Sequence, residues 1–211
     1  EIIEQAIHAL HAYTPFLPAV KTGQPRRFVY RKILLIFTVM SSRIGLVMLG
    51  GNSMKEITKV VVDAMGGDNA PHEIIKGAVE AVGKSDAIHV ILVGKEDVIN
   101  QELSGYTYNK EQISVVHTSE VIETAEPPVM AIRRKKDSSM VVAMNLVKAG
   151  EADAFVSAGS TGAILVGAQA IIGRIPGVKR PPLAPVLPTA KGPLVLVDCG
   201  ANVDSRPDHL V

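Results

Sequence analysis

Residues 57–63 read Ile-Thr-Lys-Val-Val-Val-Asp, and Ala-Met-Gly-Gly follows at 64–67. The segment is rich in β-branched residues and almost continuously apolar, which is typical of a strand buried on both faces of a parallel sheet. Residues 68–71 (Asp-Asn-Ala-Pro) then offer capping side chains and a proline suited to a first helical turn. Apolar residues recur at helical spacing over 74–82. The stretch therefore predicts a strand, a glycine turn and a helix.

The same alternation continues to the end of the chain. Further strands are expected at 89–93, 113–117, 154–157 and 194–198, and further helices at 95–103, 140–147 and 161–172. Ser138 and Ser139 are expected to cap the helix at 140, while Gly150 and Gly173 are expected to end their helices. Strands separated by helix-length segments predict an α/β fold, with a mostly parallel sheet between two helical layers.

Residues 1–53 differ from the rest of the chain in charge and composition. They carry six Lys or Arg and two Glu, a net charge of +4, whereas residues 54–211 carry the other 16 basic and 19 acidic residues, a net charge of −3. The apolar run at 33–40 is too short to span a bilayer. We expect residues 1–53 to be an N-terminal extension outside the native protein, translated from upstream of a start at Met54. Residues 54–211 stop soon after an expected strand, so we interpret them as the N-terminal part of a truncated domain.

Composition narrows the functional classes. A hydrophobic content of 47% with 20% charged residues can bury a core. A net charge of +1, with four Phe, four Tyr and no Trp, gives no case for nucleic-acid binding. The single cysteine, Cys199, excludes a disulfide framework and a Cys-rich zinc site, which favours a cytoplasmic protein. Because Cys199 lies between an apolar segment and a glycine with no adjacent base, we expect it to be a buried structural residue.

Three glycine turns follow expected strands, at the sheet edge where open parallel sheets bind ligands. The first turn spans 63–71, the second 157–163 and the third 198–202. The second fits phosphate best, because Gly159 follows a strand, the hydroxyls of Ser160 and Thr161 can donate to phosphate oxygens, and Gly162 opens a helix. The alternative that each glycine only makes a tight turn stays open, although three such turns at successive strand ends weaken it.

The remaining motifs concern nucleotide binding, metal binding and docking of a partner. The spacing excludes a P-loop, a G-x-G-x-x-G fingerprint and an H-E-x-x-H zinc motif, and the six histidines form no ligand pattern. These motifs give no case for a metal site. The basic run Arg133-Arg134-Lys135-Lys136 predicts either a solvated helix face or a docking site for an acidic partner.

Residues 54–211 resemble the N-terminal part of the acyl-(acyl-carrier-protein):phosphate acyltransferases, bacterial enzymes of phospholipid synthesis. Six ordered motifs carry the resemblance, at 62–68, 133–140, 157–163, 173–175, 180–185 and 198–204. It covers all 158 residues from 54 to 211 and leaves out residues 1–53. Ser160, Cys199 and Arg206 depart from it, because the family commonly has Asn, Val and Lys there. Backbone donors at the second turn are unaffected by the first of these changes.

The resemblance implies reversible transfer of a fatty acyl group from acyl carrier protein to inorganic phosphate, giving acyl phosphate without a cofactor. It also implies a three-layer sandwich like that of the isocitrate and isopropylmalate dehydrogenases. Further implied properties are a cytoplasmic homodimer and peripheral contact with the membrane or with a downstream glycerol-3-phosphate acyltransferase. Two alternatives stay open: an enzyme that uses acyl-CoA, and a truncated, non-catalytic fragment that only binds acyl carrier protein.

On the same resemblance, each group of candidate residues receives a role. Phosphate would be bound by Gly159, Ser160, Thr161 and Gly162. Catalytic contacts with the carbonyl or phosphate would come from Asn202 and Arg206. The turns would be supported by Asp63, Gly66, Gly67, Asp68 and Gly200, and the carrier protein would dock on Arg133, Arg134, Lys135 and Lys136.

Overall fold

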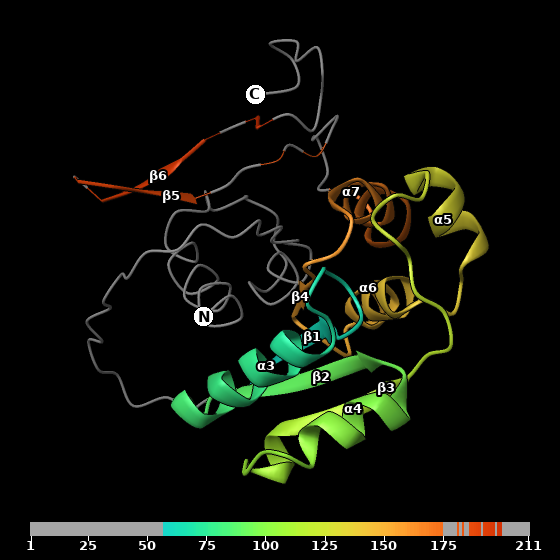
Figure 1. Ribbon diagram of the computed structural model, residues 1–211. Coiled ribbons are helices and arrows are strands. Elements are labelled where there is room, and N and C mark those ends of the chain that lie inside the picture. The colour runs from blue at the N-terminus through green and yellow to red at the C-terminus, as the bar shows by residue number, and fades with distance from the viewer. Residues whose placement is uncertain are drawn as a thin grey trace.

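Four parallel strands form the central sheet of the computed structural model, which describes residues 57–174, 181, 183, 186–190, 192–196, 198 and 199 (Figure 1). The strands are β1 (Thr58–Asp63), β2 (Ile88–Gly94), β3 (Ile113–His117) and β4 (Ala154–Val156), in the order β3-β2-β1-β4. β1 pairs with both β2 and β4, so Val62 lies between Leu92 and Val156. The segment that starts the sheet in sequence is therefore an inner strand, as its apolar character predicts.

Helices cover both faces of this sheet. One layer contains α3 (His72–Lys84) and α4 (Glu96–Leu103). The other contains α5 (Pro128–Arg134), α6 (Ser139–Ala149) and α7 (Thr161–Gly167), which continues as a π-helical segment over Ala168–Ile172. A short 3-10 helix, η1 (Lys110–Gln112), leads into β3. The α/β fold with helices on both faces is confirmed for this part of the chain.

The alternation of side chains along β1 builds two cores. Val60 and Val62 pack with Ile75 of α3 in one apolar cluster, while Val61 packs with Met144 of α6 in the other. Successive side chains of a strand point to opposite faces, so a continuous apolar run satisfies both layers at once. Burial of this kind supplies the main favourable free energy of the fold.

Local capping signals are confirmed at one helix and wrong at another. Ser138 accepts a hydrogen bond from the backbone N–H of Val141 (3.4 Å), and Gly150 ends α6 with φ of 77°. At α3, the expected side-chain cap is wrong: the N-cap residue is Pro71, with no side-chain cap bond, and the Glu73 N–H donates to the Asn69 carbonyl instead (3.1 Å). Backbone hydrogen bonds in the turn before α3 satisfy N–H groups at the start of the helix, so no side-chain cap is required.

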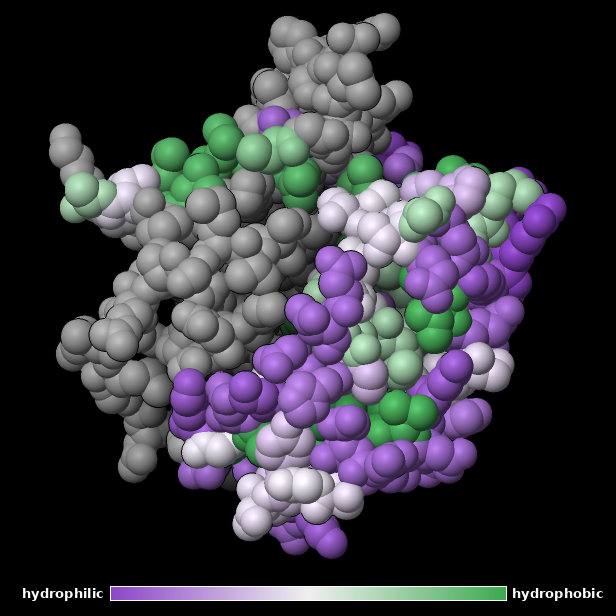
Figure 2. All heavy atoms as spheres, in the orientation of Figure 1, coloured by the Kyte–Doolittle hydropathy of each residue, from purple (hydrophilic) through white to green (hydrophobic). Residues whose placement is uncertain are grey.

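The expected fifth parallel strand at 194–198 is wrong. β6 (Gly192–Val195) instead pairs antiparallel with β5 (Val186–Thr189) in a separate two-stranded sheet. Only two residues separate β5 from β6, and so short a connection permits a hairpin but not a parallel crossover. Hydrophobic side chains gather over this hairpin in Figure 2. Leu194, Val195 and Leu196 are among the exposed large hydrophobic residues.

The hairpin also changes the place of Cys199. The described strand ends at Val195, so Cys199 does not close a buried strand. It is an exposed, free cysteine, and the expectation of a buried structural residue is wrong. Its backbone N–H donates to the Leu183 carbonyl (2.8 Å).

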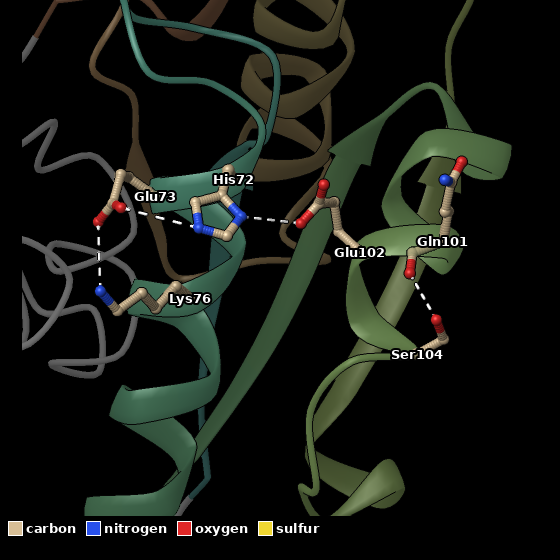
Figure 3. A network of polar contacts seen from close by, with 6 residues as sticks. All are labelled: His72, Glu73, Lys76, Gln101, Glu102 and Ser104. Atoms are coloured by element: carbon tan, nitrogen blue, oxygen red, sulfur yellow. Dashed lines mark hydrogen bonds and ion pairs between the residues drawn. The ribbon is translucent and has the colours of Figure 1, made fainter.

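A surface network ties α3 to α4 (Figure 3). The His72 ring lies between two carboxylates, with its Nδ1 2.9 Å from Glu102 Oε2 and its Nε2 3.9 Å from Glu73 Oε1. Lys76 approaches the other oxygen of Glu73 at 3.7 Å. Exposed pairs of this kind contribute little to stability, so the network fixes the surface of one layer rather than the fold.

Among the described residues, no helix combines the length and the apolar character needed to cross a bilayer.

Candidate active site

Asp63 and Ser157 meet at the carboxyl edge of the sheet. Asp63 is the last residue of β1, and Ser157 follows β4, the neighbouring strand. Because Val62 pairs with Val156, the next residue on each strand lies at the same level. The Ser157 hydroxyl donates to Asp63 Oδ2 at 2.8 Å, and the Asp63 side chain is only 1% exposed. The ends of the two strands are thus joined by a buried hydrogen bond.

This bond extends into both glycine turns. The Met65 N–H donates to Asp63 Oδ1 (3.2 Å), which folds the first turn over its own strand end. The Gly159 N–H donates to Ser157 Oγ (3.0 Å), which folds the second turn back toward Asp63. One carboxylate therefore organises the first turn directly and the second turn through Ser157.

Close packing of the two turns requires glycine at 66 and 67. A Cβ atom on Gly66 would lie 2.4 Å from Asp63 Oδ2 and 2.9 Å from Ser157 Oγ. Gly67 has φ of +111°, and a Cβ there would lie 3.0 Å from the Ala158 Cβ. A side chain at either position would separate the turns or distort the backbone. Asp68, by contrast, is exposed at the rim of the first turn.

Burial disfavours the ionised form of the Asp63 carboxyl group. Burial raises its pKa above the ordinary value of 3.8, and this effect exceeds the opposing hydrogen bonds from Ser139, Ser157, Met65 and Gly66. Those four donors all favour the ionised form. A titratable group that is perturbed by burial and faces several donors is a typical feature of a functional site.

The second turn presents donors at the start of α7. Ser160 is buried and caps the helix, since its Oγ accepts from the Ala163 N–H (3.3 Å), which leaves its hydroxyl proton able to donate. Thr161 is exposed, and the N–H groups of Thr161 and Gly162 lie in the first turn, where they have no partner within the helix. The Gly159 N–H is already bound to Ser157, and a Cβ atom on Gly159 would lie 3.2 Å from Met140 Cε and 3.4 Å from Gly66 Cα, so glycine at this position serves the packing of the two turns.

The start of α7 packs against the start of α5. A Cβ atom on Gly162 would lie 2.8 Å from Cγ of Pro128, the first residue of α5. Gly162 therefore serves a helix–helix contact as well as the turn. The same contact places the second turn beside the helix that carries part of the basic run.

The basic run divides into residues with different environments. Arg133 and Arg134 form the exposed last turn of α5, whereas Lys135 and Lys136 lie beyond its end. The Lys135 Nζ donates to Glu126 Oε1 (2.5 Å) and to the Val121 carbonyl (2.6 Å). Its hydrogen bond holds the pKa of Glu126 below the ordinary range.

Lys136 is also bonded within the molecule, because its Nζ donates to the Ile132 carbonyl at 3.1 Å. Of the four predicted docking residues, Arg133, Arg134 and Lys136 are exposed, and Lys135 is half-buried.

Other candidate residues fall partly outside the described structure. Gly200, Asn202 and Arg206 lie outside the described residues. Asp198 is described, and its Oδ1 accepts from the Leu183 N–H at 2.8 Å.

The sequence analysis did not single out Ser157 or Ser139 as site residues. A polar residue directly after a buried strand was the available signal for Ser157, but its partner lies 94 residues earlier in the chain. Within the described residues, no group of three His, Cys, Asp or Glu side chains lies close enough to hold a metal ion.

The fold and the site define an α/β protein with two interlocked glycine turns at the carboxyl edge of a parallel sheet. A family model described as "Fatty acid synthesis protein" matches residues 58–211, and the chain belongs to this family. It is 52% identical over 153 residues to a phosphate acyltransferase of Clostridium novyi (strain NT), which covers 72% of this chain and 46% of the relative. The phosphate acyltransferase of Clostridium beijerinckii is 54% identical over the same coverage. The chain thus spans about half the length of these relatives.

The charge of Asp63 predicts how stability depends on pH. Because burial raises its pKa in the folded state, the stability it contributes is fully present below the ordinary value of 3.8 and is lost as pH rises through the raised value. Asp63→Asn cannot titrate. The free energy of unfolding of the wild type minus that of Asp63→Asn should therefore fall with rising pH, by roughly 1.4 kcal/mol for each unit of pKa elevation. Urea unfolding followed at several pH values measures it.

Asp137→Asn is the matched control with the opposite sign. Hydrogen bonds from the Ser119 hydroxyl and N–H hold the pKa of Asp137 low, so its contribution is lost as pH falls. A wild-type advantage over Asp63→Asn that grows with pH would contradict the expected direction.

Proposed function

We propose that the complete protein transfers a fatty acyl group reversibly from acyl carrier protein to inorganic phosphate, giving acyl phosphate for phospholipid synthesis. The observation that carries the proposal is the pair of interlocked turns, in which Ser157 joins the second turn to the end of β1 through Asp63. Membership of a fatty acid synthesis family and relatives that bear the name phosphate acyltransferase support it.

The reaction requires little acid or base catalysis from side chains. A phosphate oxygen attacks the thioester carbonyl, a C–O bond forms and the C–S bond breaks. The carrier protein leaves as a thiolate, which then takes up the proton released from phosphate. Phosphate near neutral pH is already an anionic nucleophile, and a thiol with a pKa of about 8.5 leaves readily as thiolate. The protein must supply position and hydrogen-bond donors for the developing oxyanion. No metal or organic cofactor is needed for these steps.

Phosphate binds, in this proposal, at the second turn. The Ser160 and Thr161 hydroxyls and the N–H groups of Thr161 and Gly162 donate to phosphate oxygens. The backbone at Gly159 contacts the phosphate without a side chain between them. Asp63 is buried, and a carboxylate in contact with phosphate would repel it, so Asp63 supports the turns and does not contact phosphate. Asn202 and Arg206 contact the carbonyl or phosphate from the third turn, which Gly200 supports.

The broader assignments belong to the same proposal. The complete protein adopts a three-layer sandwich of the isocitrate and isopropylmalate dehydrogenase type and acts as a cytoplasmic homodimer. It releases acyl phosphate near the membrane, where a glycerol-3-phosphate acyltransferase consumes it.

A hydroxylamine trap tests the reaction. The chain is incubated with acyl-loaded carrier protein, with and without inorganic phosphate, and acyl phosphate is converted to hydroxamate. We expect hydroxamate that depends on both phosphate and protein, above the background that hydroxylamine gives with the thioester alone. A second arm replaces the carrier protein with acyl-CoA.

Each outcome separates the alternatives. Faster product from acyl-CoA would favour the acyl-CoA enzyme. Carrier-protein binding without phosphate-dependent product would favour a non-catalytic fragment.

The outer face of α5 is the proposed docking surface for acyl carrier protein. Val129 and Met130 are 52% and 40% exposed, and Arg133 follows them by one helical turn, beside Arg134. Apolar and charged side chains lie next to one another over this helix in Figure 2. An acidic partner with an apolar contact face complements such a surface. The contact of Pro128 with Gly162 places this surface next to the second turn.

Charge reversal tests the docking surface. The double variant Arg133→Glu, Arg134→Glu should raise the KM for acyl carrier protein by about 10-fold at low salt, and added salt should shrink the difference because it screens exposed charges. The double variant Lys110→Glu, Lys148→Glu is the matched control, since it makes the same change in net charge at exposed residues on other elements. Equal effects of the two double variants would show that only the overall charge matters.

A further inference from the structure

We propose that Asp63 and Ser157 are positioning residues for the phosphate step: the carboxylate orients Ser157, and Ser157 orients the turn that holds phosphate. This inference rests on the proposed function and assigns a role to Ser157 and to the buried carboxyl group of Asp63. The observation that carries it is the continuous chain of hydrogen bonds from Gly159 through Ser157 to Asp63.

The direction of these bonds is fixed by chemistry. The Ser157 hydroxyl has one proton, and it donates that proton to Asp63 Oδ2, so its oxygen is left to accept from the Gly159 N–H. Asp63 Oδ1 meanwhile accepts from the Met65 N–H. Each oxygen of the carboxylate thus receives a donor from a different turn. A group without two acceptor oxygens could not serve both turns in this way.

Asp63 also reaches the start of α6. Ser139, the first residue of that helix, is fully buried, and its hydroxyl lowers the pKa of Asp63. Three elements that are distant in the chain, β1, β4 and α6, therefore converge on one carboxylate. Such convergence fixes geometry more tightly than a single bond, since each donor restricts the positions open to the others.

A direct chemical role for Asp63 does not fit its surroundings. Its side chain is 1% exposed, and a Cβ atom on Gly66 would already meet its Oδ2 at 2.4 Å, so the first turn lies over it. A carboxylate in contact with phosphate would also repel it. Asp63 therefore acts through Ser157 and the turn backbone.

The test compares Ser157→Ala with Ser157→Thr in the full chain. Alanine removes the hydroxyl, whereas threonine keeps it. KM for phosphate and KM for acyl carrier protein are measured in the hydroxylamine assay. We expect Ser157→Ala to raise the KM for phosphate about 10-fold, the effect of losing a hydrogen bond to a charged group, with the KM for acyl carrier protein changed less than about 2-fold. Ser157→Thr should recover most of the loss.

Ser114→Ala is the matched control. It also removes a serine hydroxyl. Ser114 lies in β3, away from the carboxyl edge of the sheet, and its hydroxyl bonds to His89 Nε2 at 3.0 Å. It should leave both KM values unchanged. Thermal unfolding of all four proteins shows whether any loss of activity follows a loss of stability.

Two results would overturn the inference. One is an active chain in which Ser157→Ala leaves the KM for phosphate unchanged. The other is a loss in Ser157→Ala that affects both KM values equally and follows the drop in unfolding temperature, which would mean a purely structural role. Absence of phosphate-dependent hydroxamate from the complete protein with its unmodified sequence is a different result, because it would overturn the proposed function itself.

Discussion

The buried hydrogen bond between Ser157 and Asp63 is the constraint on which the carboxyl edge of this sheet depends. It joins residues 94 positions apart, at the ends of adjacent strands. Each partner also accepts a hydrogen bond from a backbone N–H of its own turn, Asp63 from Met65 and Ser157 from Gly159. Glycine at 66 and 67 follows from it, since the turns touch where a Cβ atom would have no room. Burial of the Asp63 carboxylate lowers the stability of the folded protein. The arrangement of the two turns is therefore kept at a cost in folding free energy, as is common in functional sites.

The helical layer on the same side of the sheet connects this edge to a surface. α5 begins against Gly162 and ends in two exposed arginines. The next helix, α6, begins with Ser139, whose hydroxyl lowers the pKa of Asp63. The proposed docking surface and the proposed phosphate turn are therefore parts of one packed unit. A carrier protein bound on α5 would deliver its thioester next to the donors of the second turn, which is the proximity that this reaction requires.

Local signals in the sequence predicted most of the central fold. The apolar run of β1, the Ser138 cap and the Gly150 terminus of α6 are decided by neighbours in the chain, and the structure confirms all three. The hairpin of β5 and β6 was missed because periodicity gives no pairing direction; the two-residue connection was the decisive feature. Ser157 was missed for a related reason. Ser157 meets Asp63 only because β4 lies beside β1, and local sequence patterns do not predict the order of strands in a sheet.

Amide hydrogen exchange with and without inorganic phosphate tests the central claim most directly, because it reports on the turn without requiring turnover. The account predicts that phosphate slows exchange at Thr161 and Gly162, the first-turn N–H groups of α7, and leaves Gly94 at the end of β2 unchanged. Exchange at the second turn that is indifferent to phosphate, or protection confined to other strand ends, would contradict it.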